Sequence, residues 1–323
     1  MDSLHIKELE QEAAHKLSQA SYCPKKLALI HAGVSLAVTA VLAILHLLLS
    51  RGISTTGGLA GIGTRTALES IRYILQLAAS IALPFWEMGF IYCALGFSRE
   101  QTRTPENLTA GFRRIGTLVR SWLLQGLLYF AVAFAALQIV SIVYAVSPFS
   151  RQMMVIVEQL LADPTFLESG NIAPEIAEQL FRGLIPVYAF SGLLFLVLAI
   201  PLAYRLRMTP YRIFEEDRPR AIQAMAQSRA MMRSNCKALF QVDLHFWWYY
   251  LLQVLVALVS NLDILLPAAG VTLPVREDAA FLVFLGVHTA LSLLMAWQLR
   301  SRVETVYACV YNRLLPQEGS IGI

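Results

Sequence analysis

A single acidic residue lies deep within an apolar stretch of this sequence. Glu87 follows Arg72 by fifteen residues and stands near the middle of the stretch 73–97. A carboxylate at such a depth in a bilayer costs at least about 3 kcal/mol, so we expect it to face the interior of a helix bundle, and it is a candidate for a functional site. Pro84, one helical turn earlier, releases a backbone carbonyl from its helical hydrogen bond. Glu87 and Pro84 together are therefore candidates for a proton or cation site.

A histidine in a later apolar stretch is a candidate partner of this acid. His288 lies at a comparable depth in the stretch 279–299. The alternative is structural, because a protonated and hydrogen-bonded Glu87 would only lock the packing of helices. The sequence leaves both interpretations open. His31 and His46 lie near opposite ends of the first apolar stretch, and we expect them to face the membrane interfaces.

The elements that must position these residues are transmembrane helices. Hydrophobic residues make up 57% of the 323 residues and charged residues only 15%, against about 45–50% and about 25% in soluble domains. This composition excludes a soluble monomer and a disordered chain. None of the apolar stretches alternates with a period of two, which excludes a β-barrel. Six stretches reach the roughly 20 residues that cross a bilayer as a helix: 27–49, 73–97, 118–146, 184–204, 245–266 and 279–299.

The fold predicted is all-α: a polytopic membrane protein with six transmembrane helices arranged as three hairpins, and with amphipathic helices on the cytoplasmic side. Lys and Arg decide the orientation. With the amino terminus in the cytoplasm, the inner segments hold 20 of the 26 Lys and Arg residues, which places both termini in the cytoplasm. Thiols stay reduced there, so we expect no disulfide among the four cysteines near the inner side, Cys23, Cys93, Cys236 and Cys309.

The chain divides into three parts. Residues 1–26 form a predicted amphipathic cytoplasmic helix, which either packs on the bundle or lies at the membrane interface. Residues 27–315 form the six-span membrane domain, and 316–323 a short tail. The last inner segment, 300–315, is expected to be a further amphipathic helix along the inner face, with an apolar side formed by Val303, Tyr307, Val310, Tyr311 and Leu314.

The inner segment after the fourth span is the most basic part of the chain. Its eight cations are Arg205, Arg207, Arg212, Arg218, Arg220, Arg229, Arg233 and Lys237. Each basic residue near a membrane surface attracts anionic headgroups by about 1 kcal/mol. We therefore expect contact with anionic lipids at the cytoplasmic face, and a docking surface for a membrane or soluble protein partner is a second interpretation. Nucleic acid is not expected as a partner, because the positive-inside asymmetry already explains the charge.

Motifs for catalysis and for metal binding are absent from the sequence. It contains no H-E-x-x-H, no G-x-S-x-G and no phosphate-binding loop, and its cysteines lack metal-ligand spacing. We therefore expect no enzymatic activity, no cofactor and no metal.

Several short motifs resemble a bacterial family of six-span integral membrane proteins, domain of unknown function family 975. The most specific lie between the fourth and fifth spans, with further matches before the first span, around the second and at the end of the chain. They are 6–17, Pro84 with Gly89, 111–116, 208–211, 217–219, 228–232, 235–240, 246–248 and 306–311. Ser234 and Trp247 stand where the family has glycine. The resemblance implies a bacterial cell membrane protein and brings no established activity.

Three functions remain as expectations. The preferred one is a non-enzymatic scaffold, regulator or accessory subunit of a membrane assembly, because of the inner helices and the basic segment. The second is a transporter of a small solute or ion built on Glu87 and Pro84. The third is a lipid-handling protein, suggested by the basic segment and the aromatic run 247–250.

Overall fold

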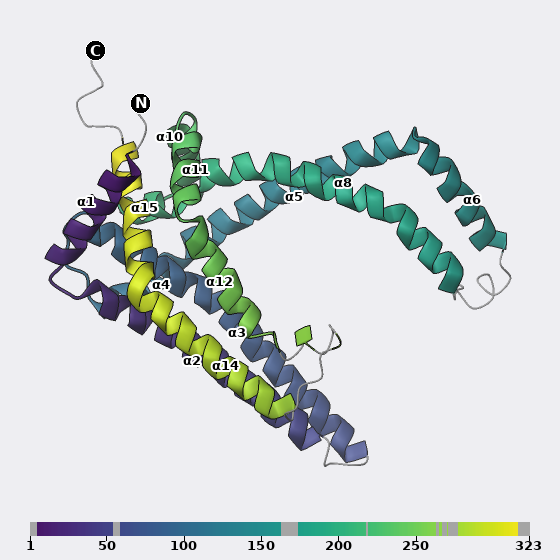
Figure 1. The fold of residues 1–323 in the computed structure, drawn as a ribbon, viewed down its shortest axis with the longest axis horizontal. Coiled ribbons are helices and arrows are strands. Elements are labelled where there is room, and N and C mark those ends of the chain that lie inside the picture. Colours follow the sequence, from purple (N-terminus) through teal and green to yellow (C-terminus); the bar gives the residue numbers. More distant parts are fainter. Residues whose placement is uncertain are drawn as a thin grey trace. The chain divides into compact units, whose positions relative to one another are not determined.

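The computed structural model describes residues 5–53, 59–162, 174–217, 219–262, 265–266, 270 and 277–315. Helices dominate these residues, and none of them lies in a β-strand (Figure 1). The all-α prediction is therefore confirmed. The chain forms two compact units, a first unit of residues 1–118 with 208–323 and a second unit of residues 119–207. The predicted tail 316–323 lies outside the described residues.

The predicted spans correspond to five long helices and one bent pair of helices. Within the described residues, five helices are long and apolar enough to cross a membrane, and a bent pair of helices makes a sixth if its two parts form one span. The five are Pro24–Leu45, Thr66–Phe97, Ile115–Ala145, Ile176–Glu215 and Ala279–Leu314. The bent pair, α11 (Cys236–His245) and α12 (Trp247–Val259), turns by 58°. The protein is thus a polytopic membrane protein, although the fifth span is broken near its predicted start.

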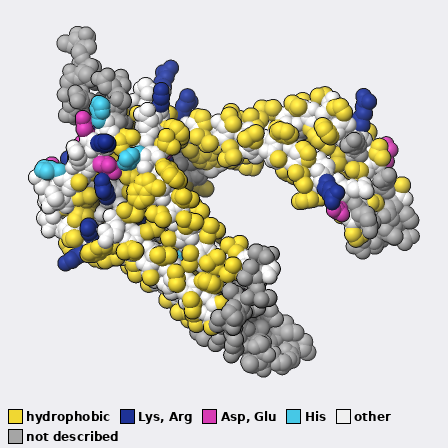
Figure 2. All heavy atoms as spheres, viewed as in Figure 1, with side chains coloured by type: hydrophobic (Ala, Val, Ile, Leu, Met, Phe, Trp, Pro, Cys, Tyr) yellow, Lys and Arg dark blue, Asp and Glu magenta, His cyan; other side chains and the backbone are white. Residues whose placement is uncertain are grey.

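Two helical hairpins form the apolar part of the first unit. Helix α2 (Pro24–Ile53) packs antiparallel to α3 (Leu59–Phe97), and α12 packs on α14 (Glu277–Met295) (Figure 1). Hydrophobic side chains cover this part of the unit, whereas charged side chains gather at the end where the chain's first helix lies (Figure 2). This segregation is what a helix bundle needs if lipid surrounds one part of it and water the other.

A short helical segment after α3 folds back against it. The segment consists of η1 (Pro105–Thr109) and α4 (Ala110–Arg113). A side chain at Gly89 would place its Cβ 1.8 Å from the carbonyl oxygen of Leu108, and one at Gly111 would lie 1.9 Å from that of Phe85. Both glycines are therefore required, because the two backbones approach too closely for any Cβ.

The second unit is a helical hairpin with a short helix at its tip. It contains most of α5 (Ile115–Ala145), then α6 (Pro148–Ala162) and α8 (Pro174–Leu206). At the tip, the Tyr144 hydroxyl donates a hydrogen bond to the Gly183 carbonyl over 3.2 Å. Many apolar side chains of α5 are largely exposed, such as Leu123 at 68% and Ile142 at 65%. Such a surface suits contact with lipid.

The sequence predicted a separate amphipathic helix along the inner face at residues 300–315. In the structure this segment continues the last span. Helix α14 continues through the π-helical turn η2 (Ala296–Arg300) into α15 (Ser301–Leu314). Helix α15 is also buried on most of its circumference, and its fully or nearly buried residues include Val303, Thr305, Val306, Tyr307, Ala308, Cys309, Val310 and Tyr311. The apolar side that the sequence indicated is thus only part of the contact surface, because neighbouring helices surround α15.

The amino-terminal helix packs on the bundle, which was one of its two predicted positions. Helix α1 (Ile6–Gln19) lies against α15 and buries Leu9 and Ala13 completely. Glu12 accepts charge-assisted hydrogen bonds from Lys16 and from Arg313, each over 2.7 Å. Burial raises the pKa of Glu12, but these two cations outweigh it and hold the pKa below the usual value of 4.5. Polar contacts thus reinforce the apolar docking of α1.

Candidate functional site

The acid singled out by the sequence has an arginine as its partner. Glu87 on α3 accepts a hydrogen bond from Arg300 Nη2 on η2. Arg300 was expected just beyond the last span, in the cytoplasmic segment. The two residues meet because α3 and the α14–η2–α15 helix pass one another in the first unit. The prediction that Glu87 pairs with His288 is therefore wrong, and the charge of Glu87 is balanced.

A fully buried histidine completes the surroundings of Glu87. The Nε2 atom of His31 on α2 lies 3.6 Å from a Glu87 carboxylate oxygen and 3.2 Å from the Trp86 carbonyl. The His31 ring stacks on Trp86 with centroids 5.5 Å apart, and the Trp86 indole donates to the His31 carbonyl over 3.0 Å. The expectation that His31 faces an interface is thus wrong. The sequence contained one signal for this contact, because His31 lies about as far from the start of α2 as Glu87 lies from the end of α3.

The other two predicted members of the polar site lie apart from this cluster. Pro84 is inside α3 with its ring exposed. His288 on α14 forms a hydrogen bond between Nδ1 and the Val256 carbonyl of α12 over 2.9 Å. Because a carbonyl can only accept, Nδ1 carries the proton, and Nε2 of a neutral ring remains an acceptor. The sequence-based site is therefore divided between two places. The side chain of His46 lies outside the described residues.

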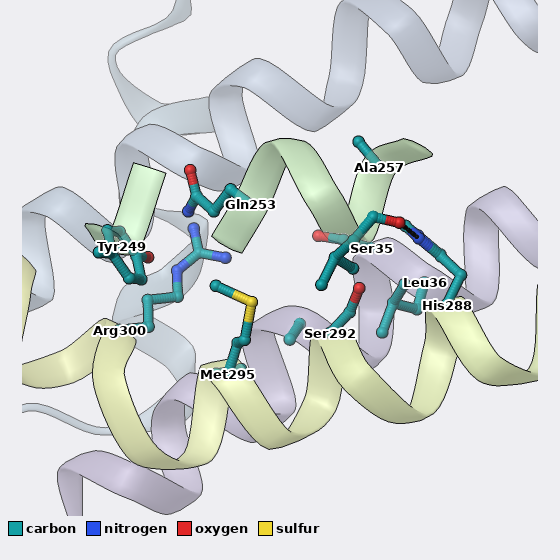
Figure 3. A pocket seen from close by; sticks show the side chains of 12 residues that line it. Ser35, Leu36, Tyr249, Gln253, Ala257, His288, Ser292, Met295 and Arg300 are labelled. Atoms are coloured by element: carbon teal, nitrogen blue, oxygen red, sulfur yellow. Dashed lines mark hydrogen bonds between the residues drawn. The ribbon is translucent and has the colours of Figure 1, made fainter. Parts of the chain in front are cut away.

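A cavity of about 220 Å³ connects His288 with Arg300. It lies between α2, α12 and the helix formed by α14 and η2 (Figure 3). Its polar lining residues are Ser35, Tyr249, Gln253, His288, Ser292 and Arg300. In Figure 3 the Arg300 guanidinium extends toward Gln253 at one end, Ser35 and His288 lie at the other, and Met295 projects between them. The cavity is thus mainly apolar, with a few polar side chains at its two ends.

The eight predicted lipid- or partner-contacting cations fall into different environments. Arg212 is half-buried and pairs with Glu215 over 2.6 Å and Glu216 over 3.4 Å, so its role is internal. Arg205 lies in the last turn of α8 and Arg207 follows this helix, and both interact with other residues. Arg218 lies outside the described residues. The remaining four are exposed, and we call them the basic surface: Arg220, Arg229, Arg233 and Lys237.

The basic surface follows one short segment of the first unit. Arg229 belongs to α10 (Ala221–Met232), Arg220 and Arg233 flank that helix, and Lys237 lies in the first turn of α11. No acidic residue occurs between Pro219 and Val242. The four side chains have no ion-pair partner within the described ranges. A positive field therefore surrounds this segment.

Comparison with family models, with curated proteins and with solved structures finds no match for this chain.

A polar network around α15 was not anticipated from the sequence. The Tyr311 hydroxyl donates to Glu215, which also accepts from Arg99 over 2.8 Å. The Tyr307 hydroxyl donates to Asp243 and lies 2.7 Å from the Tyr250 hydroxyl. The sequence showed these tyrosines as part of an apolar face. The only signal for this network in the sequence was the presence of the tyrosine hydroxyls and of acids in other segments. Helical periodicity does not identify contacts between segments that are distant in sequence.

Metal binding finds no support in the described part of the chain. No group of three or more His, Cys, Asp or Glu side chains is close enough to hold a metal ion there. The polar side chains of the cavity are hydroxyl, amide, imidazole and guanidinium groups, which suit hydrogen bonding more than cation coordination.

Proposed function

We propose that this protein is a non-enzymatic scaffold or accessory subunit of a membrane assembly, and that its basic surface docks an acidic protein partner. The observation that carries the proposal is the exposure of Arg220, Arg229, Arg233 and Lys237 on a unit whose acids are largely engaged internally. The resemblance to family 975 and the distribution of Lys and Arg support placing the protein in a bacterial cell membrane with both termini in the cytoplasm.

The internal pairing of acids explains why the basic surface retains its field. Glu10 lies 3.2 Å from Arg302, Glu12 pairs with Lys16 and Arg313, and Glu215 pairs with Arg99 and Arg212. The cations in these pairs are already neutralised, whereas those of the basic surface are not. Complementary charge accelerates association and selects the orientation of a partner, so an acidic protein face is the natural counterpart.

The surface also has a fixed geometry, which a scaffold requires. Helix α10 packs against α9 (Thr209–Glu215), and buries Ala224, Met225, Ser228 and Met232. Arg114 and Thr117 donate to the carbonyls of Asp217 and Pro219 over 2.5 and 3.2 Å. The segment bearing the cations is therefore held to the rest of the first unit. The absence of catalytic motifs from the sequence further supports a role without chemistry.

Photocrosslinking in native membranes tests the proposal. A photoreactive residue at Gln223, which is exposed on α10, should capture a discrete protein partner. Combined Arg229→Glu and Arg233→Glu substitutions should reduce that crosslink about tenfold, which corresponds to about 1.4 kcal/mol.

The matched control is Arg113→Glu, which reverses an exposed cation in α4 and should leave the crosslink unchanged. The proposal is contradicted if only lipid is captured at Gln223, or if Arg113→Glu and the double substitution have equal effects. Capture of lipid alone would instead indicate that the basic surface binds anionic lipid headgroups, which the same cations attract.

A further inference from the structure

We infer that the cavity between α2, α12 and α14 binds a small uncharged solute with hydroxyl or amide groups, and that the Glu87–Arg300 pair keeps this site neutral. The inference goes beyond the docking role of the basic surface, which belongs to a different part of the first unit. It also assigns Glu87 a role other than the proton or cation site that the sequence suggested.

The size of the cavity fits such a ligand. Its volume of about 220 Å³ far exceeds the roughly 15 Å³ that one water molecule requires. Its walls come from three helices of one unit, and polar side chains lie at both ends (Figure 3). Ligand sites between helices of a bundle are typically apolar with a few polar groups that fix orientation. This cavity has that character.

The balance of charge selects an uncharged occupant. Arg300 is the one Lys, Arg, Asp or Glu side chain among the lining residues, and it already forms an ion pair with Glu87. Because Glu87 already balances the charge of Arg300, an anion in the cavity would find no unpaired counter-charge, and a cation would meet the guanidinium. An ion without its own counter-charge is strongly disfavoured among apolar helices. Hydrogen bonding is therefore the main interaction that the site offers.

The hydrogen-bonding groups of the cavity are of both kinds. His288 uses Nδ1 to donate to the Val256 carbonyl, so Nε2 of the neutral ring is an acceptor. The Ser292 side chain lines the cavity, and Arg300 Nε is buried without a partner. The amide of Gln253 supplies a donor and an acceptor. Hydroxyl and amide solutes match this mixture because they too donate and accept.

Cysteine accessibility provides a direct test. We would introduce Ser292→Cys after replacing Cys23 and Cys236 by serine, since Cys93 and Cys309 are buried. The full chain in nanodiscs is treated with hydroxyethyl methanethiosulfonate, a small neutral thiol reagent, and modification is followed by mass spectrometry. Glycerol or urea should slow modification of Ser292→Cys at least threefold, whereas sodium acetate and methylammonium chloride should not. A Ser18→Cys control on the exposed face of α1 should respond to none of them.

A second variant tests the role of Glu87 separately. Glu87→Gln removes the carboxylate and leaves Arg300 charged, so acetate should now slow the modification of Ser292→Cys. Gln253→Leu, which leaves the ion pair intact, should abolish protection by glycerol and urea without creating protection by acetate. The inference is overturned if Ser292→Cys is unreactive, if glycerol and urea leave its rate unchanged, or if charged and uncharged solutes protect equally in the unsubstituted Glu87 background.

Discussion

At the residue scale, the Glu87–Arg300 pair changes how Glu87 is interpreted. An isolated carboxylate in a span is a candidate for proton or cation binding. A carboxylate that is hydrogen-bonded to a guanidinium is already compensated, and removing one partner should cost more than removing both. The pair should therefore stabilise the fold as well as determine which solutes the cavity accepts.

A double-mutant cycle measures this coupling. Arg300→Gln alone should reduce the free energy of unfolding by about 2 kcal/mol, because Glu87 loses its counter-charge. This value is below that of a fully buried pair, since 42% of the Glu87 side chain is exposed. Adding Glu87→Gln should recover about half of the loss. Denaturant unfolding in detergent gives the values, and purely additive effects would contradict the coupling.

The lowered pKa of Glu12 predicts an effect of pH on the docking of α1. The ionised form is the one stabilised, so its contribution is complete above the usual pKa of 4.5 and is lost as pH falls through the lowered value. Hydrogen exchange of α1 should therefore accelerate below about pH 4.5. Glu12→Gln should accelerate exchange at pH 7 and flatten this response. An unchanged pH profile in the variant would contradict the assignment to Glu12.

At the element scale, backbone contact between α3 and the η1–α4 segment depends on two glycines. Gly89→Ala would place a methyl group against the Leu108 carbonyl, whose position is fixed by its own helix. We expect a loss of about 1–3 kcal/mol, as for other overpacked sites. Gly116→Ala is the control, because nothing lies within 4 Å of its added Cβ. Thermal unfolding compares the two, and equal effects would contradict the close approach.

Helix α15 shows how much of a helix's structure the spacing of its apolar residues predicts. The apolar positions 303, 307, 310, 311 and 314 correctly indicated a helix. They did not indicate that η2 joins it to the last span or that other helices enclose it. A π-turn inserts an extra residue and rotates the helix after it, so the faces of α15 are set by η2. The sequence pattern contains no comparable signal for the contacts of Tyr307 and Tyr311 with acids more than sixty residues away.

At the scale of the whole molecule, the cysteines offer a test of the proposed orientation. Cys23 is exposed, whereas Cys93 and Cys309 are buried. If both termini are cytoplasmic, a membrane-impermeant thiol reagent should label Cys23 only after cells are permeabilised. Cys23→Ser should remove most of the label, and Ser18→Cys in that background should restore it. Labelling of Cys23 in intact cells would contradict the orientation.

The sequence by itself determined the class of protein and the six apolar stretches, and it predicted a side of the membrane for each loop. These properties depend on the length of apolar segments and on the local density of charge, and both are readable along the chain. It also identified Glu87, His288 and the basic segment as unusual.

Only the tertiary structure decided what these residues do together. Glu87 meets Arg300 across 213 positions of sequence, His31 becomes buried beside them, and His288 lines a cavity with Arg300 instead of binding Glu87. Four of the eight cations form an exposed surface, while Arg212 is paired internally. The physical reason is that helical periodicity specifies which face of a helix is apolar, but the pairing of faces depends on how the helices pack against one another.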